Sequence, residues 1–233
     1  MLDIIAKPLG MLMLWIFNVV NDYGLAIIVF TILTKILLLP LNIKQTESTK
    51  KMNEINPKMK ALQEKYKNDK EKLNQKLMEL YKEENYNPAS GCLPMLIQMP
   101  IIFALFYVIQ QPIKYVFTEA SGINFAEISK SFLWIKDLSL PESGASIVMI
   151  GSIAIPILAI LSGLTTFIQF KMTMPKGNKD QTQSMMSTIM PVFIGWMSYT
   201  FPSGLVIYWI VGNIFTIAQQ YFMLRVIPAK KEA

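Results

Sequence analysis

The sequence predicts an all-α polytopic membrane protein with five transmembrane helices and a polar helical hairpin outside the bilayer. Two observations lead to this fold class. Of the 233 residues, 52% are hydrophobic and 16% are charged, whereas soluble domains carry about 25% charged residues. The charges are also unevenly placed, because long apolar runs alternate with lysine-rich segments. This pattern is typical of a chain that crosses a bilayer several times.

The N-terminal segment, residues 1–20, contains an apolar stretch that begins only at Pro8. A stretch of this length is too short to cross a bilayer easily. It is more typical of an interfacial helix or of the core of a signal peptide. A polar turn at residues 21–24 follows it, in place of a small-residue cleavage site. We therefore expect an interfacial helix in this segment.

Five apolar runs are the predicted transmembrane spans. The first run just crosses a hydrocarbon core of about 30 Å at the rise of an α-helix. The second contains Pro94 and Pro100, which should kink it. The connection at 112–144 carries Trp134 and other aromatic residues, as expected at a membrane–water interface. The predicted spans are residues 24–41, 91–111, 145–170, 185–201 and 203–224.

The segment at 44–87 is strongly polar, with eleven lysines and eight acidic residues. Two narrow apolar seams at helical spacing run through it, separated by a turn signal at Asn68-Asp69. This pattern favours two short antiparallel helices that stand out of the membrane, and the alternative is one bent helix with a solvated face. The first seam is Met52, Ile55, Met59, Leu62 and Tyr66, and the second is Leu73, Leu77 and Leu80.

The distribution of basic residues predicts the orientation. With five spans, one side of the membrane receives residues 44–87, 171–184 and the C-terminal tail, which together hold seventeen Lys and Arg residues. The other side receives the N-terminal segment and residues 112–144, which hold four. Because basic loops stay in the cytosol, we expect the N-terminus outside, the C-terminus inside and the hairpin in the cytosol.

Several chemistries are excluded by composition. The chain has no histidine and a single cysteine, Cys92, so disulfide frameworks, most zinc sites and histidine acid–base catalysis are ruled out. No glycine-rich phosphate loop of the Walker type is present. We therefore expect a protein that is not an enzyme, binds no metal or cofactor and hydrolyses no nucleotide.

Lys35 is the one charged residue within the predicted spans, near mid-depth of the first. A lysine at such a depth costs about 2.5–3.5 kcal/mol to insert. It either reaches the nearby cytosolic surface with its long stem or faces a wet cavity. Thr31 lies on its face one turn earlier, and polar residues such as Gln169 and Asn213 occur in other spans. Tyr208 and Trp209, from their chemistry alone, are expected to be core residues.

Four stretches resemble the YidC-type membrane protein insertases of the Oxa superfamily. They are YGLAIIVFTILTKILLLPL, the hairpin INPKMKALQEKYKNDKEKLNQKLMELYKEENYNP, the segment NPASGCLPMLIQMPIIFALFYVI, and MPVFIGWMSYTFPSGLVIYWIVGNIFTIAQQ. The motif Phe-Pro-Ser-Gly-Leu followed by Tyr-Trp is the most specific of these features. Together the stretches cover most of residues 22–225.

The resemblance implies a bacterial plasma-membrane insertase and chaperone in which the five spans enclose a hydrophilic groove open to the cytosol. Lys35 stands where the family normally has an arginine, which keeps the charge but loses the planar fork. By the same resemblance the groove residues are Lys35, Thr31, Gln169, Tyr208 and Trp209, and residues 1–20 form an interfacial amphipathic helix on the outer face. The implied partners are nascent membrane proteins, the lipid bilayer, the ribosome, the signal recognition particle pathway and the Sec translocon, with no direct nucleic-acid recognition.

Two other interpretations remain open from the residues. A small-solute channel could line its pore with Lys35 and select anions, although no internal repeat is visible in the sequence. A structural subunit of a larger membrane complex would have the same composition and no activity of its own.

Overall fold

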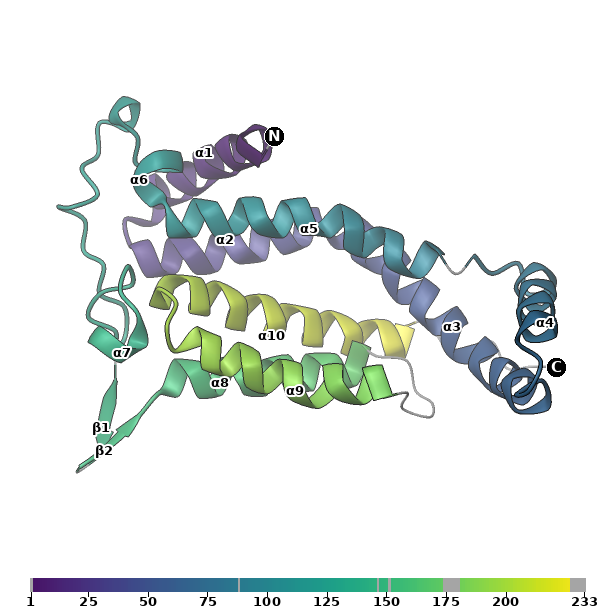
Figure 1. Cartoon of the computed structure of the whole chain (residues 1–233). Helices are drawn as coiled ribbons and strands as arrows, with labels where there is room; N and C mark the ends of the chain where they lie inside the picture. Colours follow the sequence, from purple (N-terminus) through teal and green to yellow (C-terminus); the bar gives the residue numbers. More distant parts are fainter. Residues whose placement is uncertain (1, 88, 146, 151, 174–180, 227–233) are drawn as a thin grey trace.

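The computed structural model describes residues 2–87, 89–145, 147–150, 152–173 and 181–226. Most of these residues are helical, and several long helices lie side by side in a bundle (Figure 1). The bundle consists of α2 (Tyr23–Leu37), α5 (Ala89–Gln110), α8 (Ile157–Thr173), α9 (Gln181–Ser198) and α10 (Ser203–Val226). We call the end from which α3 (Leu39–Lys65) and α4 (Lys70–Glu83) project the α3–α4 end, and the opposite end the loop end.

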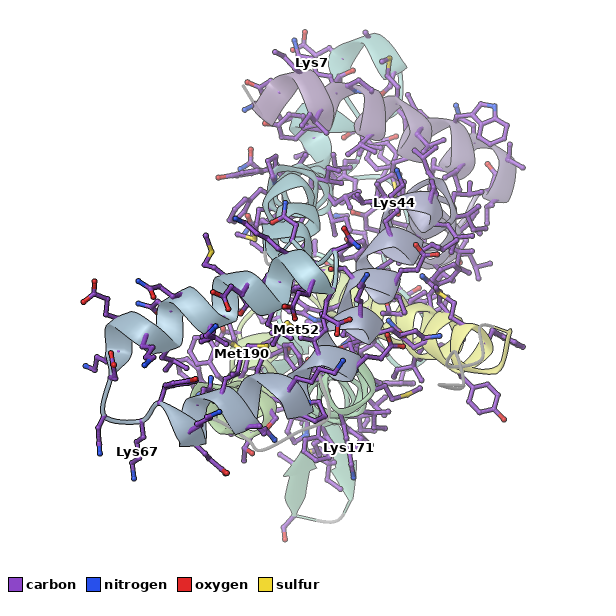
Figure 2. The ribbon with its side chains drawn as sticks, turned by 90° about the vertical axis from the view of Figure 1, so that its right-hand side faces the viewer. Lys7, Lys44, Met52, Lys67, Lys171 and Met190 are labelled. Carbon is purple, nitrogen blue, oxygen red and sulfur yellow. The ribbon has the colours of Figure 1, made fainter. Side chains whose placement is uncertain are left out.

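Helix α1 (Leu2–Val20) crosses the bundle helices instead of running along them (Figures 1 and 2). It packs closely at Gly10, where an added Cβ would lie 1.9 Å from the carbonyl oxygen of Tyr115. Its opposite face exposes a stripe of large apolar residues at helical spacing, Ile4, Met11, Trp15 and Val19. The helix is long and apolar enough to span a bilayer, so its interfacial position stays a prediction.

The first predicted span, 24–41, corresponds to α2, which ends at Leu37 and therefore earlier than predicted. The carboxylate of Asp22 caps its start by accepting the amide of Leu25 at 2.8 Å. The chain then bends by 57° into α3. Pro40 explains the bend, since it lacks an N–H group and disfavours helical backbone in the residue before it.

Two helices, α3 and α4, form the polar segment, so the alternative of one bent helix does not hold. The turn lies where the sequence indicated it, and Asp69 caps α4 by accepting the amide of Lys72 at 3.0 Å. Ile55, Leu80 and Tyr86 are buried between the two helices. Met52, Met59 and Leu62 of the first predicted seam pack against this small core, whereas Tyr86 was part of neither predicted seam.

The predicted helix over 145–170 is wrong in its first part. Helix α8 begins at Ile157, and the preceding residues form an antiparallel β-hairpin of β1 (Val148–Ile150) and β2 (Ile153–Ile155). Isoleucine and valine dominate both strands, and β-branched side chains favour strands over helices. The sequence Gly151-Ser152 between them is a two-residue hairpin signal.

The other predicted spans coincide largely with α5, α9 and α10, although the spans 91–111 and 185–201 extend past the helix ends at Gln110 and Ser198. Among the described residues, length and composition qualify Asp3–Val20 and Ser203–Met223 as spans, and the bent pair α2 and α3 as a third. Shorter apolar helices cover Met99–Gln110, Ile157–Thr173 and Ser187–Ser198. The count of five spans therefore stays a prediction. The predicted basic loop at 171–184 and the basic tail lie largely outside the described residues.

The loop end is covered by the connection between α5 and α8. This connection contains α6 (Pro112–Tyr115), a short 3-10 helix η1 (Glu119–Ser121) and α7 (Glu142–Ala145). A hydrogen bond joins this connection to the start of α10, because the amide of Gly204 donates to the Leu138 carbonyl at 2.8 Å. Beneath it lies an aromatic cluster of Phe17, Tyr23, Phe117 and Phe125. The apolar core is therefore closest to this end.

Candidate functional site

Helices α2 and α10 run in the same direction and touch along their length. Near the loop end, Gly204 lies against Ile27, with 2.9 Å between an added Cβ and the Ile27 side chain. Two turns further, Gly212 lies against Lys35, whose Cε would be 3.2 Å from an added Cβ. A glycine at 212 therefore leaves room for the lysine stem to lie across α10.

Lys35 is half-buried between these helices. Its Nζ donates to the hydroxyl of Thr216 on α10 at 3.3 Å, and that hydroxyl in turn donates to the Gly212 carbonyl at 2.9 Å. Among the described residues, no carboxylate lies within 4.0 Å of Nζ. An ammonium group has three hydrogens to donate, so Lys35 keeps donors for a ligand or for water.

Thr31 lies beside Lys35 but is fully buried. Its hydroxyl donates to the Ile27 carbonyl of its own helix at 2.6 Å, and its methyl group faces Gly212. The Thr34 hydroxyl likewise donates to the Phe30 carbonyl of the same helix at 2.9 Å. Thr31 therefore supports the position of Lys35 by packing and adds little polar surface itself.

A second polar contact joins α8 to α10. The Asn213 amide donates to the hydroxyls of Thr165 and Thr166 at 3.2 and 2.9 Å, and all three residues are buried. Gln169 lies one turn beyond them on the same face of α8 and is half-buried. It therefore extends this polar face of α8 toward the α3–α4 end.

Polar contacts continue along α10 to the α3–α4 end. The Gln220 amide donates to the hydroxyl of Thr46 on α3 at 3.0 Å. Gln219 is 9% exposed, and its Oε1 has no hydrogen-bond partner among the described residues. We call the whole set the polar seam; its members are Lys35, Thr46, Thr165, Thr166, Asn213, Thr216, Gln219 and Gln220.

Tyr208 and Trp209 lie on α10 on the loop-end side of the polar seam. Tyr208 precedes Gly212 by one turn on the same face, is half-buried and packs against the apolar core. Trp209 is also half-buried. Among the described residues, no hydrogen bond or cation–π contact joins either aromatic residue to Lys35, whose hydrogen-bond partner Thr216 lies about two turns further along α10.

Sequence reasoning missed Thr216, the hydrogen-bond partner of Lys35. The available signal was the spacing of Gly212, Thr216 and Gln220, which places a small residue and two polar residues on one face of an apolar helix. Thr165 and Thr166 were missed as well. Threonine is common in membrane helices, so only a partner such as Asn213 distinguishes them.

The polar seam leads toward the most basic part of the described chain. Figure 2 views the molecule from the α3–α4 end, with Lys44 near the start of α3, Lys67 at the tip of the hairpin and Lys171 at the end of α8. The opposite, loop end is covered by the α5–α8 connection.

A bundle of apolar helices that holds a polar seam defines a helical membrane protein. The sequence profile of the 60Kd inner membrane protein family matches residues 15–231, so the chain belongs to this family. This assignment agrees with the resemblance that the motifs indicated.

Curated relatives and one solved structure support the assignment. The membrane protein insertase YidC of Syntrophobacter fumaroxidans is 43% identical over 224 residues, which is 95% of this chain and 38% of that protein. The insertase YidC of Clostridium perfringens is also 43% identical, over 94% of this chain and 84% of that protein. A crystal structure of an active YidC insertase with its first transmembrane domain resolved has a TM-score of 0.64 and 28% identity, covering 94% of this chain and 46% of that one. The chain thus covers well under half the length of several relatives and most of the length of the Clostridium perfringens relative.

Proposed function

We propose that this chain is a membrane protein insertase and chaperone that works without hydrolysing a nucleotide. The relatives that share most of its length carry the name insertase. The observation that carries the mechanism is Lys35, a half-buried cation bound to Thr216 and without a carboxylate partner among the described residues. A client with a polar, acidic segment can supply the missing counter-charge.

In this mechanism the polar seam lines a hydrophilic groove that opens to the cytosol. A polar segment of the client enters the groove and hydrogen-bonds to it, which shortens the dry path across the bilayer. The apolar span of the client then moves into lipid past α2 and α10, and burial of its apolar surface drives the step. Gln169, Tyr208 and Trp209 complete the groove, and Thr31 holds Lys35 in place.

The proposal includes the orientation and the partners. The N-terminus lies outside, and the C-terminus and the α3–α4 hairpin lie in the cytosol, because the basic segments are concentrated there. The hairpin is then positioned to meet ribosomes or factors of the signal recognition particle pathway. The insertase acts alone or beside the Sec translocon.

Site-specific photo-crosslinking tests the groove. Benzoylphenylalanine replaces Trp209 in one variant and Trp196 in a matched variant; Trp196 is 66% exposed on α9. Each full-length variant, in native membranes, receives a ribosome-stalled client with one span and an acidic leading segment. We expect crosslinks to the leading segment from position 209 and few from position 196. Equal crosslinking from both positions, or crosslinks from 196 alone, would contradict a groove at this place.

A further inference from the structure

The β1–β2 hairpin projects from the loop end, away from the bundle. Figure 1 shows both strands leaving the ends of α7 and α8 at a steep angle to the bundle helices. Within the described part of the chain, the two strands pair only with each other, in the register Val148 with Ile155, Met149 with Ala154 and Ile150 with Ile153. An isolated two-stranded hairpin is at best marginally stable in water. This hairpin therefore requires contact with an apolar environment.

Neither face of the hairpin carries the residues that water-exposed strands use. Directly paired residues share a face, so Val148 and Ile155 share one face and Met149 and Ala154 share the other. Met149 is 58% exposed and Ala154 is also exposed. Exposed edge strands are normally protected by charges or proline within them, whereas the sequence from Ser143 to Phe170 contains no charged residue.

The hairpin is continuous with the lipid-facing surface of the helices that follow it. Pro156 connects β2 directly to α8, whose outer side exposes Ile160 and Leu164 by 54% and 52%. The neighbouring α9 exposes Val192 and Trp196 by 70% and 66%. In a member of an inner membrane family, apolar surface of this extent on packed helices faces lipid. The hairpin extends this surface sideways at the end of the bundle.

The length of α8 places the hairpin near the edge of the hydrocarbon core. With 17 residues, α8 is about 26 Å long at helical rise, slightly less than the core of about 30 Å. Its N-terminus at Ile157 therefore lies close to the boundary between acyl chains and headgroups. A strand pair that leaves this point at a steep angle runs along the boundary.

We propose that β1 and β2 form a lipid anchor, an apolar hairpin that lies in the headgroup–acyl boundary of the leaflet at the loop end. Lipids of the bilayer cover its exposed faces. The anchor holds the loop end at a fixed depth in the membrane, beside α8 and α9. The inference depends on membrane insertion of the bundle and not on the activity or the orientation proposed above.

Fluorescence of the full-length protein in liposomes of phosphatidylethanolamine and phosphatidylglycerol tests this anchor. In a Cys92→Ala background, Met149→Cys carries an environment-sensitive nitrobenzoxadiazole probe. Ala154→Cys is a second variant, on the paired strand. Glu119→Cys is the matched control, because Glu119 is exposed in η1 of the same connection. Circular dichroism verifies that each labelled protein keeps its helices.

The anchor predicts that probes at 149 and 154 emit at shorter wavelength than the probe at 119. Nitroxide groups near the headgroup end of the acyl chain should quench them several-fold more than nitroxides deep in the chain, and aqueous iodide should quench them least. Emission and iodide quenching equal to those at 119 would overturn the proposal. Stronger quenching by the deep nitroxides would also overturn it. A spectral shift seen in native membranes but not in pure lipid would assign the hairpin to a protein partner instead.

Discussion

Lys35 is the residue on which the proposed activity depends. It is the single charge in five predicted spans, and insertion of such a charge costs about 2.5–3.5 kcal/mol. The fold accommodates it with a glycine at 212 and one hydroxyl at Thr216. These contacts position the ammonium group without neutralising it. A purely structural lysine would be expected to have a carboxylate partner or to extend to the membrane surface.

Glu142 carries out a structural task at the other end of the bundle. It is fully buried, and its carboxylate accepts the amides of Leu158 and Ala159 at 2.8 and 2.9 Å. These amides are among the first of α8, which have no partner within the helix. The side chain thus ties α7 to the start of α8.

The change Glu142→Ala should therefore destabilise the protein. Each buried amide left without a partner costs about 1–3 kcal/mol, so we expect a clearly lower midpoint of thermal unfolding in detergent. Ser143→Ala is the control, because Ser143 is exposed beside it and should leave the midpoint unchanged. Equal midpoints for the two variants would show that the capping contact contributes nothing measurable.

At the scale of elements, sequence periodicity predicted most of the helices. Apolar runs located α5, α9 and α10, and the two seams of the polar segment located α3 and α4. The break at Leu38 and the strands at 148–155 were missed. Both occur inside continuous apolar runs, where hydropathy alone cannot distinguish a strand or a bend from a helix. Pro40 and the β-branched residues were the available signals.

The same limit applies to the candidate site. Lys35 was found because a charge in an apolar run is conspicuous, and Thr31 followed from helical spacing. Thr216 and the pair Thr165 and Thr166 could not be found, because their roles depend on which helix faces meet. The contact between α8 and α10 through Asn213 is a property of the packing and not of any one segment.

The α3–α4 hairpin should be separable from the bundle. Its core of Ile55, Leu80 and Tyr86 is its own. Its two ends lie close together, since the Tyr86 hydroxyl lies 3.0 Å from the sulfur of Met52. A short glycine–serine linker can therefore replace residues 52–84 without strain on the bundle.

We expect this deletion to lower client insertion in cells while the protein remains resistant to alkaline extraction from membranes. The physical reason is the loss of the docking surface that we propose for ribosomes or targeting factors. The charge-neutral variant Met78→Ala is the control, because Met78 is exposed on α4 outside the hairpin core. Full activity of the deletion variant would remove the recruitment role from the hairpin.

At the scale of the whole molecule, the two ends differ in charge and in closure. The α3–α4 end is lysine-rich, and the loop end is covered by the connection that contains η1 and α7. The proposed groove, closed at the loop end and open at the α3–α4 end, would accept a polar segment from one side of the membrane only. The orientation of the bundle therefore decides the direction of insertion.

Labelling of single cysteines in intact cells measures the orientation. In a Cys92→Ala background, Glu119→Cys at the loop end should react with a membrane-impermeant maleimide that has crossed the outer layers of the cell. Lys67→Cys at the hairpin tip should react only after the inner membrane is opened. The reverse pattern would contradict the arrangement with the N-terminus outside.

The most direct test of the central claim is insertion by the purified full-length protein in liposomes. A single-span client with an acidic leading segment is synthesised outside, and its protection from added protease is measured for the unaltered protein, Lys35→Ala and Lys35→Arg. The account predicts protection with the unaltered protein, a loss of about tenfold with Lys35→Ala, equivalent to about 1.4 kcal/mol, and retained protection with Lys35→Arg. Equal protection by all three proteins would contradict a role for the charged groove, and protection no greater than in empty liposomes would contradict insertion by this chain itself.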